Sequence, residues 1–205
     1  SEKAISPQAT AALEAKYGLD KPLGEQYVTY ITGVAHGDFG DSLKQRGRTV
    51  AGIIQAKFPV SAKIGGISVL VSLILGVLLG SIAALKRGKF LDSLISVIST
   101  MGIAVPSFVI CTVLMYFFGV KFRVLPTMGL SSWKHFIMPV AALAFYPTAY
   151  IMRLMRSSML DVLGQDYMRT AKAKGLSGKV QLFKHALRNA ILPVVTYVGP
   201  MLAYT

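Results

Sequence analysis

IGGISVLVSLILGVLLGSIAAL, residues 64–85, contains no Asp, Glu, Lys or Arg. A bilayer core about 30 Å thick is crossed by about 20 apolar residues at helical rise. Because hydrocarbon leaves backbone polar groups no outside partner, we expect this stretch to cross a membrane as a helix. A small residue recurs at every fourth position and forms a stripe that another helix can approach closely, within the chain or in a second subunit. The stripe consists of Ser68, Ser72, Gly76, Gly80 and Ala84.

Three further runs lack acidic and basic residues, namely Leu94 to Val120, Phe136 to Met152, and Ala190 to Thr205. The chain of 205 residues is 53% hydrophobic and only 15% charged, which is too apolar for an ordinary soluble domain. We therefore predict an all-α membrane protein, a polytopic helical bundle. Its net charge of +13 is divided among short stretches between the apolar runs, which argues against a nucleic-acid partner.

The distribution of basic residues predicts the orientation. The turn after the first run carries Lys86, Arg87 and Lys89, and residues 153–189 carry eight basic groups against two acidic ones. Both connections are expected in the cytoplasm, although contact with anionic membrane lipid would explain the same charge. The basic residues of the longer connection are Arg153, Arg156, Arg169, Lys172, Lys174, Lys179, Lys184 and Arg188. Residues 121–135 and 1–61 are then outside, which requires a further span upstream. We therefore expect the chain to be truncated at both ends.

Residues 1–61 are predicted to form an extracytoplasmic segment, followed by a transmembrane domain over 62–205 that includes the cytoplasmic segment 153–189. Within the first segment, good helix formers predict a helix over Ala9 to Tyr17 that ends at Gly18. HGDFGDSL, residues 36–43, indicates turns. The spacing of apolar residues from Val50 to Phe58 is that of a short amphipathic helix lying on the membrane, and a strap that covers the helix ends is the alternative.

Prolines interrupt the apolar runs at positions 106, 139, 147, 193 and 200, where they free carbonyl groups and permit bends. Hydroxyl groups near these positions are candidates to line a pathway, with packing or interfacial anchoring as the alternative. The candidates are Tyr146, Thr148, Tyr150 and Tyr197. Ion-coupled carriers place ionisable side chains within their spans. Since these runs have none, a transporter built from them would draw its energy from another subunit.

Enzyme chemistry has little support in the sequence. It contains the single Cys111, three histidines, no pair of residues at metal-ligand spacing and no phosphate-binding GxxxxGK[ST] loop. We therefore expect no catalytic residues, no metal and no cofactor in this chain. An intramembrane enzyme is disfavoured. A passive channel or scaffold fits the hydropathy but does not require a capped helix at Asp166, so it is the weaker alternative.

The cytoplasmic segment contains GQDYMRTAKAKG, residues 164–175. Asp166 is placed to cap a helix of about two turns, and Gly175 suits its left-handed end. Such a helix is too short to be stable alone, so other parts of the protein must hold it. After Gly178, apolar residues at spacings of three and four predict a second helix that leads into the last run.

DYMRTAKAKGL at 166–176 and HALRNAILP at 185–193 resemble the signature of permease subunits of bacterial ABC importers for oligopeptides and dipeptides. Only Ala171, Gly175 and Leu187 match the general permease signature, and Arg169 stands where that signature has Glu. YGLDKPLGEQY and HGDFGDSL resemble the same subfamily, so the resemblance covers nearly the whole chain. The residues that it assigns to ATPase coupling are Asp166, Tyr167, Met168, Arg169, Thr170, Ala171, Lys172, Ala173, Lys174, Gly175 and Leu176.

The resemblance implies the ABC importer permease fold, with six spans in a bacterial cytoplasmic membrane. This chain would hold the second to fourth spans and part of the fifth. The implied partners are a second permease subunit, two cytoplasmic ATPases that bind ATP and Mg²⁺, and an extracytoplasmic solute-binding protein. Peptide is the implied substrate, and nickel or another small solute is the alternative.

Overall fold

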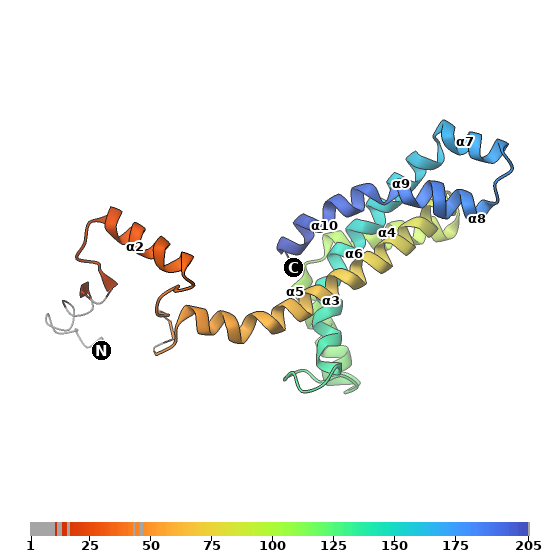
Figure 1. Cartoon of the computed structure of the whole chain (residues 1–205). Coiled ribbons are helices and arrows are strands. Elements are labelled where there is room, and N and C mark those ends of the chain that lie inside the picture. Colours follow the sequence, from red (N-terminus) through yellow and green to blue (C-terminus); the bar gives the residue numbers. More distant parts are fainter. Residues whose placement is uncertain (1–10, 12–13, 16, 43, 46, 205) are drawn as a thin grey trace. The chain divides into compact units, whose positions relative to one another are not determined.

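The computed structural model describes residues 11, 14, 15, 17–42, 44, 45 and 47–204 (Figure 1). The chain divides into two compact units, Ser1–Val60 and Ser61–Thr205, and each is described by itself. Within the described residues every named element is helical, and the only β-type pairing is an isolated bridge between Asp41 and Thr49. The predicted all-α class is confirmed.

The first unit contains α2, Leu23–Ala35, which follows a turn at Gly18. Gly18 has a φ of 65°, and its N–H donates to the carbonyl of Ala15, as expected for the end of a helix. Most of the predicted helix Ala9 to Tyr17 lies outside the described residues. Of the turns predicted over residues 36–43, one is present at His36 and Gly37, and φ is positive at Gly37 and Gly40.

The first apolar run belongs to α3, Val50–Leu85, a single helix of 36 residues. The prediction of a separate surface helix over Val50 to Phe58 is wrong, because that segment continues into the run without a break. Pro59 lies inside the helix, where its missing N–H removes one backbone hydrogen bond. The helix formers on both sides of Pro59 outweigh that loss.

The second apolar run is broken. It forms α4, Phe90–Ala104, then α5, Ser107–Leu114, which continues as the π-helix η1, Met115–Lys121. The two parts are bent by 104° at the break, so the prediction of one helix over Leu94 to Val120 is wrong. Pro106 explains the break, because it has no N–H for the carbonyl of Gly102 and it excludes helical geometry at Val105. Val105 is extended, with φ −92° and ψ 122°.

The third run forms α6, Lys134–Leu163, which passes through Pro139 and Pro147 without interruption. It is followed by α7, Asp166–Ala173, and then by a nearly continuous series: α8, Gly178–Val180; the π-helix η2, Gln181–Leu187; α9, Arg188–Ala190; and α10, Leu192–Tyr204. The series bends by 43° between Ala190 and Leu192, next to Pro193. Of the five prolines in the apolar runs, only Pro106 and Pro193 lie at or next to a break between helices, since α10 also continues through Pro200.

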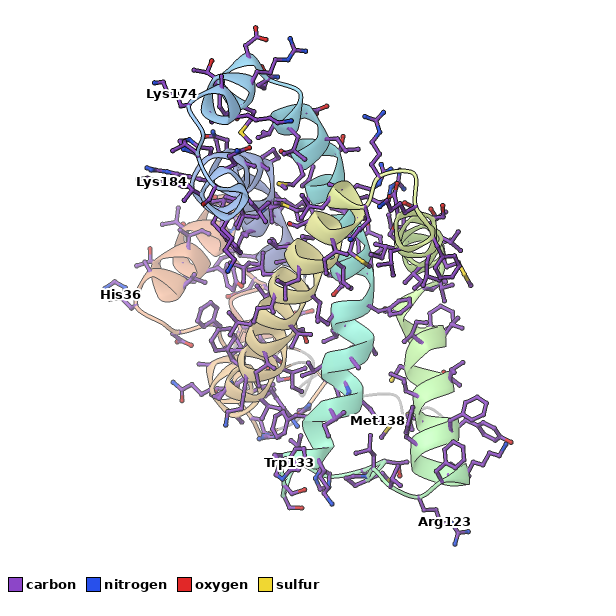
Figure 2. All side chains as sticks on the ribbon, turned by 90° about the vertical axis from the view of Figure 1, so that its right-hand side faces the viewer. His36, Arg123, Trp133, Met138, Lys174 and Lys184 are labelled. Atoms are coloured by element: carbon purple, nitrogen blue, oxygen red, sulfur yellow. The ribbon has the colours of Figure 1, made fainter. Side chains whose placement is uncertain are left out.

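Two of the described helices, α3 and α6, are each long and apolar enough to cross a membrane. Up to four spans result if each bent pair of helices counts as one. Figure 2 shows Lys174 at one end of the second unit and Arg123 and Trp133 at the opposite end. The segment around α7 and the connection between η1 and α6 therefore lie at opposite ends of the unit, as the predicted orientation requires.

Candidate functional site

The small-residue stripe of α3 lies against α6. Ser72 donates its hydroxyl to the carbonyl of Ala144 at 3.1 Å, and Ser68 donates to that of Val140 at 3.4 Å. Both serines also donate to carbonyls of their own helix, four residues earlier. All five stripe residues are buried within the second unit. In this chain the stripe serves packing between its own helices.

Two glycines of the stripe are required by the closeness of the helices. A Cβ at Gly76 would lie 2.6 Å from side-chain atoms of Ile151, and one at Gly80 would lie 2.6 Å from the carbonyl oxygen of Met152. Real Cβ atoms do not approach other atoms so closely, and the backbone of α6 cannot easily yield. Gly102 of α4 lies equally close to α6, since a Cβ added there would lie 2.6 Å from the Cβ of Ala149. Helix α6 is thus the central helix, with α3 and α4 packed closely on it.

An ion pair joins α4 to α6 close to the turn between α3 and α4. Arg156 donates from Nε to Oδ1 of Asp92 at 2.6 Å and from a terminal nitrogen to Oδ2 at 2.8 Å. The N–H of Gly88 donates to the same carboxylate at 2.9 Å. The sequence analysis missed this pair, because both residues lie just outside the uncharged runs. The signal in the sequence was an acid two residues before the run that starts at Leu94 and an arginine four residues after the run that ends at Met152.

Helix α7 presents one buried side and one charged side. Met168 and Ala171 are buried, and Met168 belongs to a core cluster with Met155, Met159 and Ala186. The other side chains of the helix are exposed. These are Asp166, Tyr167, Arg169, Thr170, Lys172 and Ala173, and Lys174, Gly175 and Ser177 continue the exposed surface. The short helix is therefore stabilised by tertiary packing, as its length demands.

The predicted capping by Asp166 is wrong. The N-cap residue is Gln165, and no side-chain hydrogen bond caps the helix, since Asp166 itself lies in the first turn. Its carboxylate favours the helix dipole there and lies 3.4 Å from Arg169, an exposed pair of little energetic value. The predicted end is present, because Gly175 has a φ of 71°.

Two side-chain contacts connect the α7 region to the helical series that ends in the last apolar run. Asn189 of α9 donates to the hydroxyl of Tyr167 at 3.1 Å. Gln181, at the start of η2, donates to the carbonyl of Leu176 at 2.6 Å. Together with the burial of Met168, these contacts make α7 and the adjoining series one packed element.

A cavity of about 690 Å³ lies beside the break at Pro106. Three of the predicted pathway residues line it, namely Tyr146, Tyr150 and Tyr197. The rings of Tyr150 and Tyr197 are in contact, with centroids 4.4 Å apart. Thr148 does not line it, and its hydroxyl donates to the carbonyl of Ala144 on the side of α6 that faces α3.

A second cavity of about 540 Å³ adjoins the first, since Ile103, Tyr146 and Tyr150 line both. Its remaining lining is mostly polar and comes from α4 and α6. These residues are Ser96, Ser99, Thr100, Arg153, Leu154, Arg156 and Ser157. The two cavities form one groove whose lining changes from aromatic to hydroxylated and cationic.

A metal site has no basis in the part of the chain that the structure describes. No three His, Cys, Asp or Glu side chains gather there in a way that would hold a metal ion.

Long apolar helices, closely packed through small residues and broken beside a groove, define a polytopic helical membrane protein. The chain belongs to the family of binding-protein-dependent transport system inner membrane components, which residues 76–205 match. The resemblance found in the segments around Gly175 and Leu187 is thereby confirmed.

Relatives match almost the whole chain. It is 43% identical over 202 residues to the dipeptide transport system permease protein DppB of Bacillus subtilis, a match that covers 98% of this chain. It is 42% identical to the oligopeptide transport system permease protein OppB of Haemophilus influenzae and 41% identical to that of Salmonella typhimurium, over 98% and 97% of this chain. The chain spans 66% of the length of each of these relatives.

Proposed function

We propose that this chain is part of the permease subunit of an ATP-driven peptide importer in a bacterial cytoplasmic membrane. Family membership and the names of the relatives support a permease for peptides. In this assignment the groove beside Pro106 forms one wall of the pathway. A second permease subunit completes the pathway, and an extracytoplasmic binding protein delivers the peptide.

The observation that carries the assignment to an ATP-driven system is the two-sided character of α7. Its apolar side is buried among Met155, Met159 and Ala186, whereas its charged side is free for a partner. A helix of 8 residues that lies at one end of the membrane unit and exposes its charged side is suited to bind in a groove of a cytoplasmic ATPase. ATP and Mg²⁺ bind that partner, and this subunit performs no catalysis.

The contacts of α7 suggest how movement passes to the spans. A displacement of the ATPase moves α7, and the packing of Met168 together with the Asn189–Tyr167 hydrogen bond moves α9 with it. Helix α10 follows α9 directly and contributes Tyr197 to the groove. The motion thereby reaches the wall of the pathway.

The test uses the complete subunit with its paired permease, ATPases and binding protein in proteoliposomes. We expect Arg169→Glu to reduce peptide uptake about tenfold or more while membrane insertion is unchanged, because the exposed guanidinium contacts an acidic group of the ATPase. Gly175→Pro should have a similar effect, because proline cannot adopt the positive φ found there. The matched control is Lys179→Glu, an exposed charge reversal beyond α7. Unchanged uptake in both the Arg169→Glu and the Gly175→Pro variants would contradict the docking assignment.

A further inference from the structure

Arg153 is a cation that the rest of the described chain leaves unpaired. It lies on α6, is exposed, and lines the polar half of the groove. Among the described residues no ion pair or hydrogen bond engages its side chain. The neighbouring Arg156 differs, because Asp92 binds it through two hydrogen bonds. The polar cavity therefore carries one uncompensated positive charge.

The hydroxyl groups beside Arg153 present acceptor oxygens. Ser99 and Thr100 both donate their protons to the carbonyl of Ser96, at 2.9 Å each. Their oxygens retain lone pairs that can accept from a ligand N–H. The cavity thus combines a guanidinium, which suits a carboxylate, with acceptors that suit amide or ammonium groups.

The aromatic half of the groove has a different preference. Tyr146, Tyr150 and Tyr197 line it together with apolar residues such as Leu143 and Ile103. Such a surface receives apolar side chains of varied shape with little selectivity. A ligand that fits both halves has an apolar body, backbone N–H groups and one carboxylate at its end.

We propose that the polar cavity is a subsite for the C-terminal carboxylate of a peptide, bound by Arg153, with the peptide body in the aromatic cavity. The proposal rests on the proposed function and assigns the substrate group that this part of the groove recognises. The terminal carboxylate is the anionic group that every unmodified linear peptide carries. A single cation beside a tolerant aromatic surface would therefore serve peptides of many sequences.

The first test compares two peptides and several variants in proteoliposomes that hold the complete importer. Tri-alanine carries the carboxylate, and tri-alanine amide lacks it. We expect Arg153→Gln to reduce uptake of tri-alanine about tenfold and uptake of the amide less than twofold, each relative to wild type. Arg153→Lys should recover much of the loss, because it keeps the charge but not the forked geometry. Arg87→Gln removes an exposed arginine that does not line the groove and should change neither rate.

Expressing each rate relative to wild type removes the preference of the binding protein, which is the same in all samples. An equal loss for both peptides, or no loss, would overturn the subsite. If wild type transports neither peptide, the proposed function fails, and a second measurement still decides whether the cavity binds anions.

The second measurement is the labelling rate of a cysteine at position 157 in the complete subunit, in which Cys111 has been replaced by Ala. Ser157→Cys is labelled with methanethiosulfonates that carry either a sulfonate or a trimethylammonium group, in nanodiscs of neutral phosphatidylcholine. Each rate is divided by the rate of the same reagent with a free thiol. We expect the sulfonate to be favoured at least fivefold, and Arg153→Gln to abolish the preference.

Equal corrected rates for the two reagents would overturn the anion site. Addition of phosphatidylglycerol to the nanodiscs distinguishes a peptide site from a lipid contact. The surface potential of that lipid acts equally on wild type and on Arg153→Gln, so the reagent preferences of these two proteins are compared in it. If the lipid abolishes the difference between them, Arg153 binds lipid headgroups and the peptide assignment is wrong. A difference that persists supports the subsite.

Discussion

Arg156 of α6 donates two hydrogen bonds, of 2.6 and 2.8 Å, to the carboxylate of Asp92, although the residues are 64 positions apart in the chain. The Asp92 side chain is 7% exposed and that of Arg156 is 31% exposed. The carboxylate also accepts from the N–H of Gly88, so the pair fixes the turn between α3 and α4 onto α6. It lies at the edge of the polar cavity, which Arg156 lines.

Removal of the Asp92 charge should destabilise the subunit strongly. Asp92→Asn leaves Arg156 partly buried without its counter-charge, and we expect a loss of roughly 2–4 kcal/mol in the free energy of unfolding. Chemical unfolding of the subunit in detergent measures this loss. Asp161→Asn, a neutralisation at an exposed position of the same unit, is the control and should change stability little. Similar stability of the two variants would show that the pair contributes nothing.

Gly80→Ala should separate α3 from α6. The added Cβ would meet the carbonyl oxygen of Met152 at 2.6 Å, and we expect a loss of about 1–3 kcal/mol from overpacking. Gly66→Ala is the matched control on the same helix, since a Cβ there meets nothing within 4 Å. Its better helix propensity should keep or raise stability. The check is the unfolding midpoint of each variant, and equal midpoints would refute the close approach of the two helices.

Pro106→Ala should straighten the bend between α4 and α5. Alanine restores the N–H and permits helical geometry at Val105, so the angle of 104° is no longer imposed by the sequence. Spin labels at Val97 and Val113 would report the change as a longer distance in pulsed electron spin resonance. Pro139→Ala lies in an unbroken helix and should leave that distance unchanged. A distance that Pro106→Ala does not alter would mean that packing alone holds the bend.

Met168→Ala should release α7 from the core cluster. Loss of a buried methionine side chain costs about 2–5 kcal/mol, so the fraction of time that the helix is detached should rise tenfold or more. Trypsin cleavage after Lys172 and Lys174 would measure this release. Met168→Leu preserves the apolar volume and should cleave at nearly the wild-type rate. Equal cleavage of all three proteins would show that Met168 does not anchor the helix.

The sequence by itself determined that the apolar runs are helical and that a short segment ends in Gly175. An apolar run without charge has to satisfy its own backbone as a helix, and a glycine after Lys174 permits the positive φ that ends one. These are properties of a few consecutive residues. Asp166 was wrongly predicted to cap its helix, because the preceding Gln165 takes the cap position. A separate helix over Val50 to Phe58 was wrongly predicted, because that segment continues into the following apolar run as part of α3.

Only the tertiary structure decided which residues meet and where the chain bends. Pro106 and Pro147 each lack the N–H that would donate to the carbonyl four residues earlier. Helix α6 nevertheless continues through the buried Pro147, because α3 and α4 pack on either side of it. At the exposed Pro106 the chain breaks. The pairing of Asp92 with Arg156, and the isolation of Arg153, depend in the same way on the angle at which helices cross. That angle is fixed by the close approach of Gly76, Gly80 and Gly102 to α6, and no local pattern contains it.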